Sequence, residues 1–158
     1  MQTRPDMHPV HAPHSFEEAM EEPEKMMAAV AAPLRVLIVD DRADEIAGMA
    51  EILRRWPKIS LHTVIPKPGL VEVPELPPAD IVLLDGAMGL INDVRVWRAL
   101  GEEKFAGVVA SISSGGKPTF TDWWFADKSE IPDSPAAKVA FILFMNRLIA
   151  EQAKKRSA

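Results

Sequence analysis

Two apolar runs that end abruptly in carboxylates restrict the fold of this chain more than any other feature of its sequence. Residues 36–39 read Val-Leu-Ile-Val and are followed by Asp40 and Asp41, and residues 81–84 read Ile-Val-Leu-Leu and are followed by Asp85. Continuous runs of branched apolar residues are typical of strands buried on both faces, as in a parallel sheet covered by helices. The sequence therefore predicts an α/β fold with a parallel sheet.

The three aspartates are expected to lie close together. In open α/β sheets the functional groups gather beyond the carboxyl ends of the strands. Three close carboxylates repel one another unless a cation joins them or some of them are protonated, and oxygen ligands of this kind favour Mg²⁺. The sequence thus predicts a magnesium site at Asp40, Asp41 and Asp85. The alternative interpretation is that these residues only form turns or cap helices after buried strands.

Three motifs that follow one another in the expected order resemble the receiver domain of bacterial two-component response regulators. They are VLIVDDR at residues 36–42, IVLLDGAM at 81–88 and FADK at 125–128, and the resemblance covers residues 34–151. It implies a doubly wound, flavodoxin-like (CheY-like) sheet of five parallel strands in the order 2-1-3-4-5. Strands are expected at residues 34–39, 59–65, 80–84, 107–113 and 122–126.

The resemblance also implies a role for each residue of the site. Asp85 matches the phosphoacceptor, and Asp40 and Asp41 match the acidic pair that holds Mg²⁺ together with Asp85 and the backbone carbonyl of Ala87. Lys128 matches the invariant lysine, which pairs with the acceptor carboxylate and later with a phosphoryl oxygen. A compact ammonium charge suits both tasks. The alternative for Lys128 is a surface lysine at a strand end.

A hydroxyl group and an aromatic ring complete the implied switch. Ser113 is the best match for the hydroxyl at the end of the fourth strand, judged by its interval from Asp85, and Ser111 is the alternative. Phe125 occupies the place of the aromatic switch residue, which turns inward as the hydroxyl moves. Ser129 stands where the family has a proline after the lysine, and a cis peptide bond is much less favourable there without proline.

The second and fourth helices of the family pattern are expected to be reduced or missing. Five prolines crowd residues 66–80, and proline removes backbone donors and breaks helices. Residues 113–121 read SSGGKPTFT, which is rich in turn formers. Helices are predicted instead at residues 41–56, from Ile91 to Leu100 with Gly101 after the last turn, and from a capping Ser134 onward.

Residues 1–33 are predicted to form a flexible acidic tail, and residues 34–158 the receiver domain. The tail contains two basic and six acidic residues, so it carries most of the net charge of −5. A capping-box pattern at Ser15 predicts a helix over residues 16–32 that Pro23 interrupts. The last helix has more apolar surface than one core face needs. This surplus indicates contact with the tail, with a partner chain, with a second copy, or with a sheet left bare by the missing fourth helix.

The composition of the 158 residues argues against several classes of protein. A net charge of −5 is unsuited to a general nucleic-acid surface. The chain has no cysteine and hence no disulfide framework, which fits a reducing cytoplasm. No apolar run approaches the roughly 20 residues that span a bilayer. We therefore expect a cytoplasmic protein that binds neither nucleic acid nor membrane.

The leading hypothesis for function is a single-domain response regulator. It receives a phosphoryl group on Asp85 from a histidine kinase or phosphotransfer protein and signals by contact with a downstream protein. Such a protein is not an enzyme beyond Mg²⁺-dependent self-phosphorylation and dephosphorylation. The alternative is a pseudo-receiver that acts as an interaction module without phosphate. A hydrolase of the haloacid dehalogenase type ranks third, because it needs a second Asp where this chain has Ala87. A homodimer through the last helix is a further hypothesis.

Overall fold

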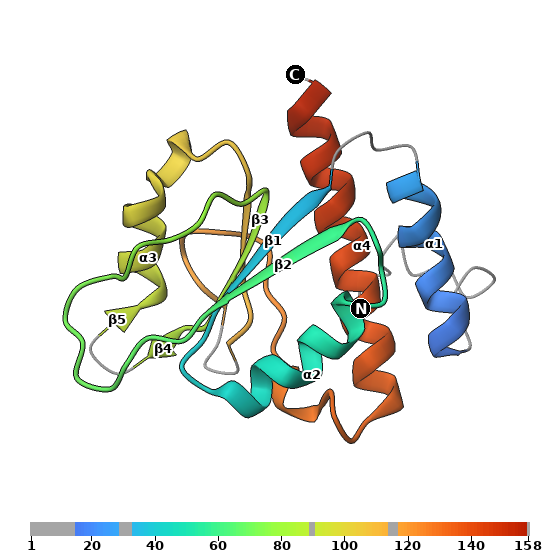
Figure 1. Cartoon of the computed structure of the whole chain (residues 1–158), viewed down its shortest axis with the longest axis horizontal. Coiled ribbons are helices and arrows are strands. Elements are labelled where there is room, and N and C mark those ends of the chain that lie inside the picture. Colours follow the sequence, from blue (N-terminus) through green and yellow to red (C-terminus); the bar gives the residue numbers. More distant parts are fainter. Residues whose placement is uncertain (1–14, 29–32, 89–90, 114–116, 158) are drawn as a thin grey trace, which may run out of the picture.

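A four-stranded parallel sheet forms the centre of the molecule (Figure 1). The computed structural model describes residues 15–28, 33–88, 91–113 and 117–157 of the chain. In spatial order the strands are β2 (Ile59–Val64), β1 (Leu34–Val39), β3 (Ile81–Leu84) and β6 (Val108–Ser111). The predicted α/β class with a parallel sheet is confirmed, and the arrangement is compatible with a flavodoxin-like fold.

The register of the strands brings the carboxyl ends of β1 and β3 side by side. Val39 is paired with Leu84, and Leu84 is paired in turn with Ser111. All of β3 is buried, and so is β1 except for one residue, as expected for strands covered on both faces. Asp40 and Asp85 directly follow these paired strand ends, so the sheet delivers both carboxylates to the same edge.

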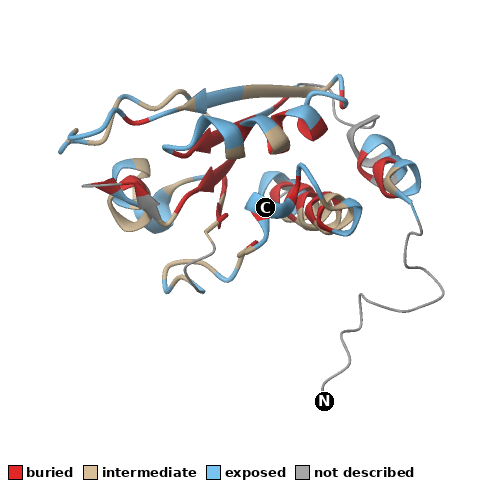
Figure 2. Ribbon diagram, turned by 90° about the horizontal axis from the view of Figure 1, so that it is seen from below, coloured by how far each residue is buried: buried red, intermediate tan, exposed pale blue. Residues whose placement is uncertain are grey.

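Two helices cover one face of the sheet. They are α2 (Ala43–Leu53), which is shorter than predicted, and α4 (Pro135–Ser157). The hydroxyl of Ser134 accepts the N–H of Ala137 at 3.1 Å, so the predicted cap of the last helix is confirmed. The buried sides of α2 and α4 join alternate residues of the strands in the larger hydrophobic cluster (Figure 2). Although α4 is long, no helix in the described part of the chain is long and apolar enough to cross a membrane.

One helix and an extended segment cover the other face. Helix α3 (Asp93–Leu100) is capped at its start by the Asn92 side chain and at its end by Gly101, whose φ of 106° is left-handed. Residues 65–80 contain no helix, which confirms the prediction that the second helix would be reduced or missing. Apolar side chains of this segment pack with α3 in the second hydrophobic cluster. An extended chain thus does the covering that a helix would otherwise do.

Several short elements connect these parts. A small antiparallel pair, β4 (Ala87–Met88) and β5 (Ile91–Asn92), follows β3 and shifts the start of α3 beyond the predicted residue 91. Single 3-10 turns, η2 (Glu102–Lys104) and η3 (Lys128–Glu130), follow α3 and precede α4. The antiparallel pair and η3 are important for the site. Asp85 lies just before β4, and Lys128 is the first residue of η3.

The predicted fifth strand is wrong, because residues 122–126 form only one isolated bridge. Ser111 pairs with Trp124 in parallel, and the N–H of Ser111 donates to the Trp123 carbonyl at 2.8 Å. The backbone does not continue along the edge, because the Thr121 side chain donates to the Val109 carbonyl at 2.8 Å and accepts the Trp123 N–H at 3.1 Å. The described residues between β6 and η3 also contain no helix, in agreement with the predicted loss of the fourth helix.

Helix α1 (Phe16–Ala28) lies within the region predicted as a tail. The hydroxyl of Ser15 accepts the N–H of Glu18 at 3.1 Å, which confirms the predicted N-terminal cap. The helix continues through Pro23, which was expected to interrupt it. Ala19 and Met20 are buried in the larger hydrophobic cluster, and burial of this face compensates for the hydrogen bond that proline removes.

Helix α1 packs against α4 and the end of α2 (Figure 1). The Trp56 indole N–H donates to the Met20 carbonyl at 3.3 Å. Arg55 forms an ion pair with Glu17 at 3.0 Å, and its guanidinium lies 4.8 Å from the centre of the Phe16 ring. Residues 16–28 therefore belong to the packed domain, in contrast to the flexible tail predicted over residues 1–33. Residues 1–14 lie outside the described residues. Contact with this helix accounts for part of the apolar surplus of α4.

A buried carboxylate fastens the amino-terminal edge of the sheet. Asp80 accepts the backbone N–H of Arg35 at 2.8 Å and forms ion pairs with the guanidinium groups of Arg35 at 3.1 Å and Arg156 at 3.0 Å. Burial alone raises the pKa of Asp80, but the hydrogen bonds from Arg35 and Arg156 outweigh it and hold the pKa below its usual value. The ion pairs join β1, the residue before β3 and the end of α4.

We expect Met20→Ala to lower the free energy of unfolding by about 2–3 kcal/mol, the usual cost of truncating a buried methionine. Met20 is only 3% exposed, and its loss should loosen α1 from the core. Urea denaturation followed by tryptophan fluorescence measures the change. Glu24→Ala, at an exposed position of the same helix, is the matched control and should cost less than about 0.5 kcal/mol. Equal costs for the two variants would show that α1 is not docked in solution.

Candidate functional site

The carboxyl ends of β1 and β3 carry the predicted acidic cluster. The N–H of Asp85 donates to the Val39 carbonyl at 3.0 Å, so the ladder holds Asp85 beside the start of the Asp40–Asp41 pair. One carboxylate oxygen from each of Asp40, Asp41 and Asp85 lies within 4.8 Å of the others. Asp40 and Asp85 are buried, whereas Asp41 is exposed. The structure therefore brings together the three residues that were predicted as metal ligands.

The side chain of Lys128 is buried between two of these carboxylates. Its Nζ lies 2.6 Å from Asp40 Oδ2 and 2.9 Å from Asp85 Oδ1. Lys128 is only 3% exposed, which excludes the alternative that it is a plain surface lysine. Burial by itself lowers the pKa of Lys128, but the hydrogen bonds to Asp40 and Asp85 outweigh burial and the pKa is raised. The lysine is thus a fixed cation at neutral pH.

One ammonium group faces three carboxylates, and the pKa of the buried Asp85 carboxyl is raised. Burial raises that pKa to about 6, the hydrogen bond from Lys128 acts in the opposite direction, and the charges of Asp40 and Asp41 add to the rise. Burial also raises the pKa of Asp40, against the hydrogen bonds from Lys128 and from the Arg42 N–H. A divalent cation would relieve this repulsion, so the donor set fits Mg²⁺ in both charge and ligand type.

Glu45 is a fourth acidic neighbour that sequence reasoning missed. It lies in the first turn of α2, with its carboxylate 3.4 Å from Lys128 Nζ and 3.6 Å from Arg42 Nε. The sequence could have indicated this contact, because Glu45 lies one helical turn after Arg42 in a helix that begins beside the acidic pair. Glu45 therefore connects the first turn of α2 to Lys128, the first residue of η3.

Ser113 lies beside Gly86, the residue that follows Asp85. An added Cβ at Gly86 would come 2.6 Å from Ser113 Oγ and 2.8 Å from Ser113 Cβ, so the two residues are in direct contact only because Gly86 has no side chain. The indole N–H of Trp124 donates to the Ser113 carbonyl at 2.7 Å and holds the end of β6 in place. The predicted hydroxyl thus reaches the neighbourhood of Asp85.

Ser111, the alternative hydroxyl, lies further back in the sheet. It is fully buried and pairs with Leu84 rather than with Gly86. Its Oγ has no hydrogen-bond partner within the part of the chain that the structure describes. Ser113 thus lies against Gly86, whereas Ser111 lies inside the sheet beside Leu84.

The remaining predicted positions differ in how close they lie to the acidic cluster. Ala87 directly follows Gly86 and begins β4. Phe125 is buried on the α4 side, with its ring centre 5.5 Å from those of Phe141 and Phe144. Its role as a switch stays a prediction, and any movement would start from this buried position rather than turn inward. The peptide bond before Ser129 is not cis.

Asp93 is a second acidic residue near the site that sequence reasoning missed. It begins α3, and its Oδ1 accepts the Val94 N–H at 2.8 Å. Its Oδ2 would lie 3.7 Å from a Cβ at Gly86, and burial raises the pKa of this carboxyl. Asp93 therefore limits the space on the α3 side of Gly86.

Comparison of the chain with protein-family models, with curated proteins and with solved structures finds no match. The functional interpretation thus depends on the geometry of the site and on the motifs that produce it.

The raised pKa of Asp85 predicts a specific pH dependence of stability. Because the pKa in the folded protein, about 6, lies above the unfolded value near 4, the protonated carboxyl favours the fold. This contribution is complete below about pH 4 and is lost as the pH rises through about 6. In the absence of divalent ions, Asp85→Asn should therefore be more stable than wild type at pH 7.5, and the difference should close below pH 4.

Urea denaturation at pH values from 3.5 to 7.5 in the presence of a chelator measures this difference. Asp133→Asn, which neutralises an exposed carboxylate, is the control and should not reproduce the crossover. A constant difference between Asp85→Asn and wild type across the range would contradict the assignment of a raised pKa to Asp85.

Proposed function

We propose that this protein is a single-domain response regulator that accepts a phosphoryl group on Asp85 from a histidine kinase. The observation that carries the proposal is the buried contact of one lysine with the carboxylates of two adjacent strand ends. Lys128 Nζ lies 2.6 Å from Asp40 and 2.9 Å from Asp85, and Asp41 lies within reach of both carboxylates. Turn or cap residues would not need a buried counterion from a distant part of the chain.

The carboxylate of Asp85 acts as the nucleophile in this proposal. Lys128 contacts Oδ1, which leaves Oδ2 to attack the phosphorus of a phosphohistidine or of a small acyl phosphate. A new O–P bond forms, the P–N or P–O bond to the donor breaks, and the departing imidazole or carboxylate keeps the electron pair. A pKa of about 6 leaves Asp85 largely ionised at neutral pH, as a nucleophile requires.

Asp40, Asp41, Asp85 and the backbone carbonyl of Ala87 would hold Mg²⁺. When bound, this ion supplies positive charge that offsets the repulsion between the attacking carboxylate and the anionic phosphoryl group. The protein contributes the fixed positions of the carboxylates, which the β1–β3 ladder sets. Glu45 and Asp40 keep Lys128 close to Asp85 while the acceptor is unmodified.

The phosphorylated state would rearrange the charges around Lys128 and Ser113. The phosphoryl group carries more negative charge than the carboxylate it replaces and offers strong acceptor oxygens. Lys128 would then pair with a phosphoryl oxygen. The Ser113 hydroxyl, held against Gly86, would donate to another. Movement of Ser113 would pull on Trp124, whose indole N–H binds the Ser113 carbonyl. The loop after β6 is therefore the proposed start of the output signal to a downstream protein.

A phosphate-independent pseudo-receiver is the second candidate. It is favoured by the reduction of the fifth strand to one bridge and by the absence of a helix from residues 65–80, since these changes alter surfaces while leaving the acidic site in place. A hydrolase of the haloacid dehalogenase type remains third, because Ala87 provides no acid. The chemistry at Asp85 distinguishes the first two candidates.

Incubation with acetyl phosphate and Mg²⁺ is expected to add one phosphoryl mass to the wild-type protein. Intact-protein mass spectrometry detects the gain, which should be labile in base because an acyl phosphate forms. Chelation of Mg²⁺ should abolish it. Asp85→Asn should gain nothing, whereas Asp122→Asn, at an exposed carboxylate, should behave as wild type. Absence of the gain from acetyl phosphate and from histidine-kinase donors, with no NMR shifts near Asp41 on Mg²⁺ addition, would favour the pseudo-receiver.

Ser113→Ala is expected to slow phosphorylation of Asp85 by about tenfold, the scale of one lost hydrogen bond to a charged group. Ser111→Ala should change the rate by less than about twofold, because Ser111 pairs with Leu84 inside the sheet. Rates of mass gain with acetyl phosphate at saturating Mg²⁺ measure both variants. The reverse ranking of the two serines would overturn the assignment of Ser113.

A further inference from the structure

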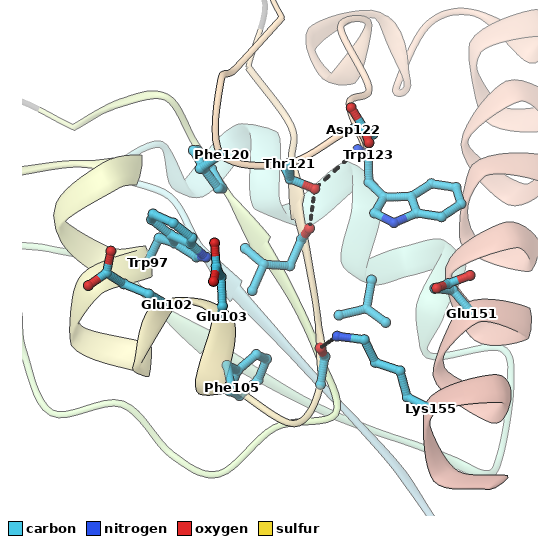
Figure 3. Close-up of a pocket in the computed structure, with 13 residues that line it drawn as sticks. Trp97, Glu102, Glu103, Phe105, Phe120, Thr121, Asp122, Trp123, Glu151 and Lys155 are labelled. Atoms are coloured by element: carbon cyan, nitrogen blue, oxygen red, sulfur yellow. Dashed lines mark hydrogen bonds between the residues drawn. The ribbon is translucent and has the colours of Figure 1, made fainter. Parts of the chain in front are cut away.

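A cavity of about 250 Å³ lies beside the outer edge of β6 (Figure 3), and no residue of the acidic cluster lines it. Its walls come from α3, η2, the segment before the Trp124 bridge, and α4. Trp97 and Phe120 form one aromatic wall, with ring centres 5.5 Å apart, and Trp123 stands on the opposite side of the strand (Figure 3). The hollow lies where the segment before Trp124 forms no strand along the edge of β6.

The exposed strand edge in this cavity is closed to pairing with another strand. By the alternation of a parallel ladder, the carbonyls of Gly107 and Val109 point away from β3. Lys155 Nζ donates to the Gly107 carbonyl at 2.6 Å, and Thr121 Oγ1 donates to the Val109 carbonyl at 2.8 Å. Both acceptors that an added strand would use first are therefore occupied. An occupant of the cavity has to be recognised through side chains.

The charge of the lining favours a cation. Glu102, Glu103, Asp122 and Glu151 line the cavity, and Asp122 is paired with Lys117 at 3.7 Å. Within the described residues, no ion pair includes Glu102, Glu103 or Glu151. Lys155 is the basic residue of the lining, and its ammonium group is directed to the Gly107 carbonyl. The cavity thus combines aromatic faces with three carboxylates that form no ion pair with any residue that the structure describes.

The turn after α3 sets the position of two of these carboxylates. Glu102 has a φ of 55°. Among the described residues, it is the only one other than glycine with a positive φ. It directly follows Gly101, whose φ is 106°. A left-handed conformation at a glutamate costs free energy and is kept where the surrounding structure requires it, often at functional positions. Here it holds two successive acidic residues at the mouth of the cavity.

We propose that this cavity binds a basic side chain, preferably arginine, from a segment of a partner protein. A guanidinium group can stack on the faces of Trp97 or Trp123 and donate two parallel hydrogen bonds to a carboxylate of Glu102 or Glu103. Lysine satisfies the charge but not the planar stacking. The lining includes no residue of the acidic cluster, and the site gives the chain a second recognition surface on the side where the fifth strand is missing.

A short capped peptide that contains arginine is the probe, and the same peptide with neutral citrulline in place of arginine is its control. In a ¹H–¹⁵N NMR titration, the indole N–H signals of Trp97 and Trp123 should shift with the arginine peptide and not with the citrulline peptide. The indoles of Trp56 and Trp124 are internal references, because they donate to the carbonyls of Met20 and Ser113 outside the cavity. They should stay in place.

The double variant Glu102→Gln/Glu103→Gln should weaken binding by about tenfold, the combined scale of a partly exposed ion pair and a cation–π contact. Glu21→Gln/Glu24→Gln changes the net charge equally at exposed positions of α1 and should stay within about twofold of wild type. Unchanged Trp56 signals show that each variant is folded. The proposal would be overturned if the two double variants weakened binding equally or if the citrulline peptide bound as well as the arginine peptide. It would also be overturned if the arginine peptide shifted other signals but not those of Trp97 and Trp123.

Discussion

A buried ion pair between a lysine and two aspartates is the interaction on which the carboxyl edge of this molecule depends. Burial of charged groups is costly unless each finds a partner in good geometry. Lys128 meets this condition by reaching Asp40 and Asp85 together, which requires the ends of β1 and β3 and the start of η3 to lie at the same place. The buried apolar runs form β1 and β3, the strand register aligns their ends, and η3 brings Lys128 to them. Together they give this ammonium group its two partners.

The same cluster is incompletely neutralised, and this is what makes it a candidate for chemistry rather than a structural fastening. The contrast with Asp80 is instructive. Asp80 is also buried, but two guanidinium groups and a backbone N–H hold its pKa below the usual value. At the opposite edge of the same sheet, burial raises the pKa of Asp85 to about 6, because the hydrogen bond from Lys128 does not outweigh burial and the charges of Asp40 and Asp41 add to the rise. At one edge two guanidinium groups face a single carboxylate, whereas at the other three carboxylates surround a single buried ammonium group.

The sequence was sufficient to predict the parts of the fold that depend on local pattern. The apolar runs at residues 36–39 and 81–84 specified buried parallel strands, and the cap at Ser134 and the left-handed Gly101 marked helix ends. The fifth strand could not be predicted correctly, because aromatic residues with high strand propensity gave no sign that Thr121 would bind the edge of β6. The docking of α1 could not be decided from the sequence. Its acidic residues and Pro23 indicate a tail, and contact of the tail with the last helix was one of several alternatives. For the site, Asp40, Asp41, Asp85 and Lys128 were found from motif order, whereas Glu45 and Asp93 approach it through helix geometry.

The contact between Gly86 and Ser113 also limits how this sequence can diverge. A side chain at position 86 would press on both the hydroxyl and the Cβ of Ser113, at 2.6 and 2.8 Å, so replacing Ser113 by alanine would not make room for it. Only glycine at position 113 removes both obstacles, and it also removes the hydroxyl. A descendant that keeps a hydroxyl at position 113, with the backbone unchanged, must keep the glycine at position 86. The two positions are thereby coupled in evolution by volume alone, whatever chemistry selection acts upon.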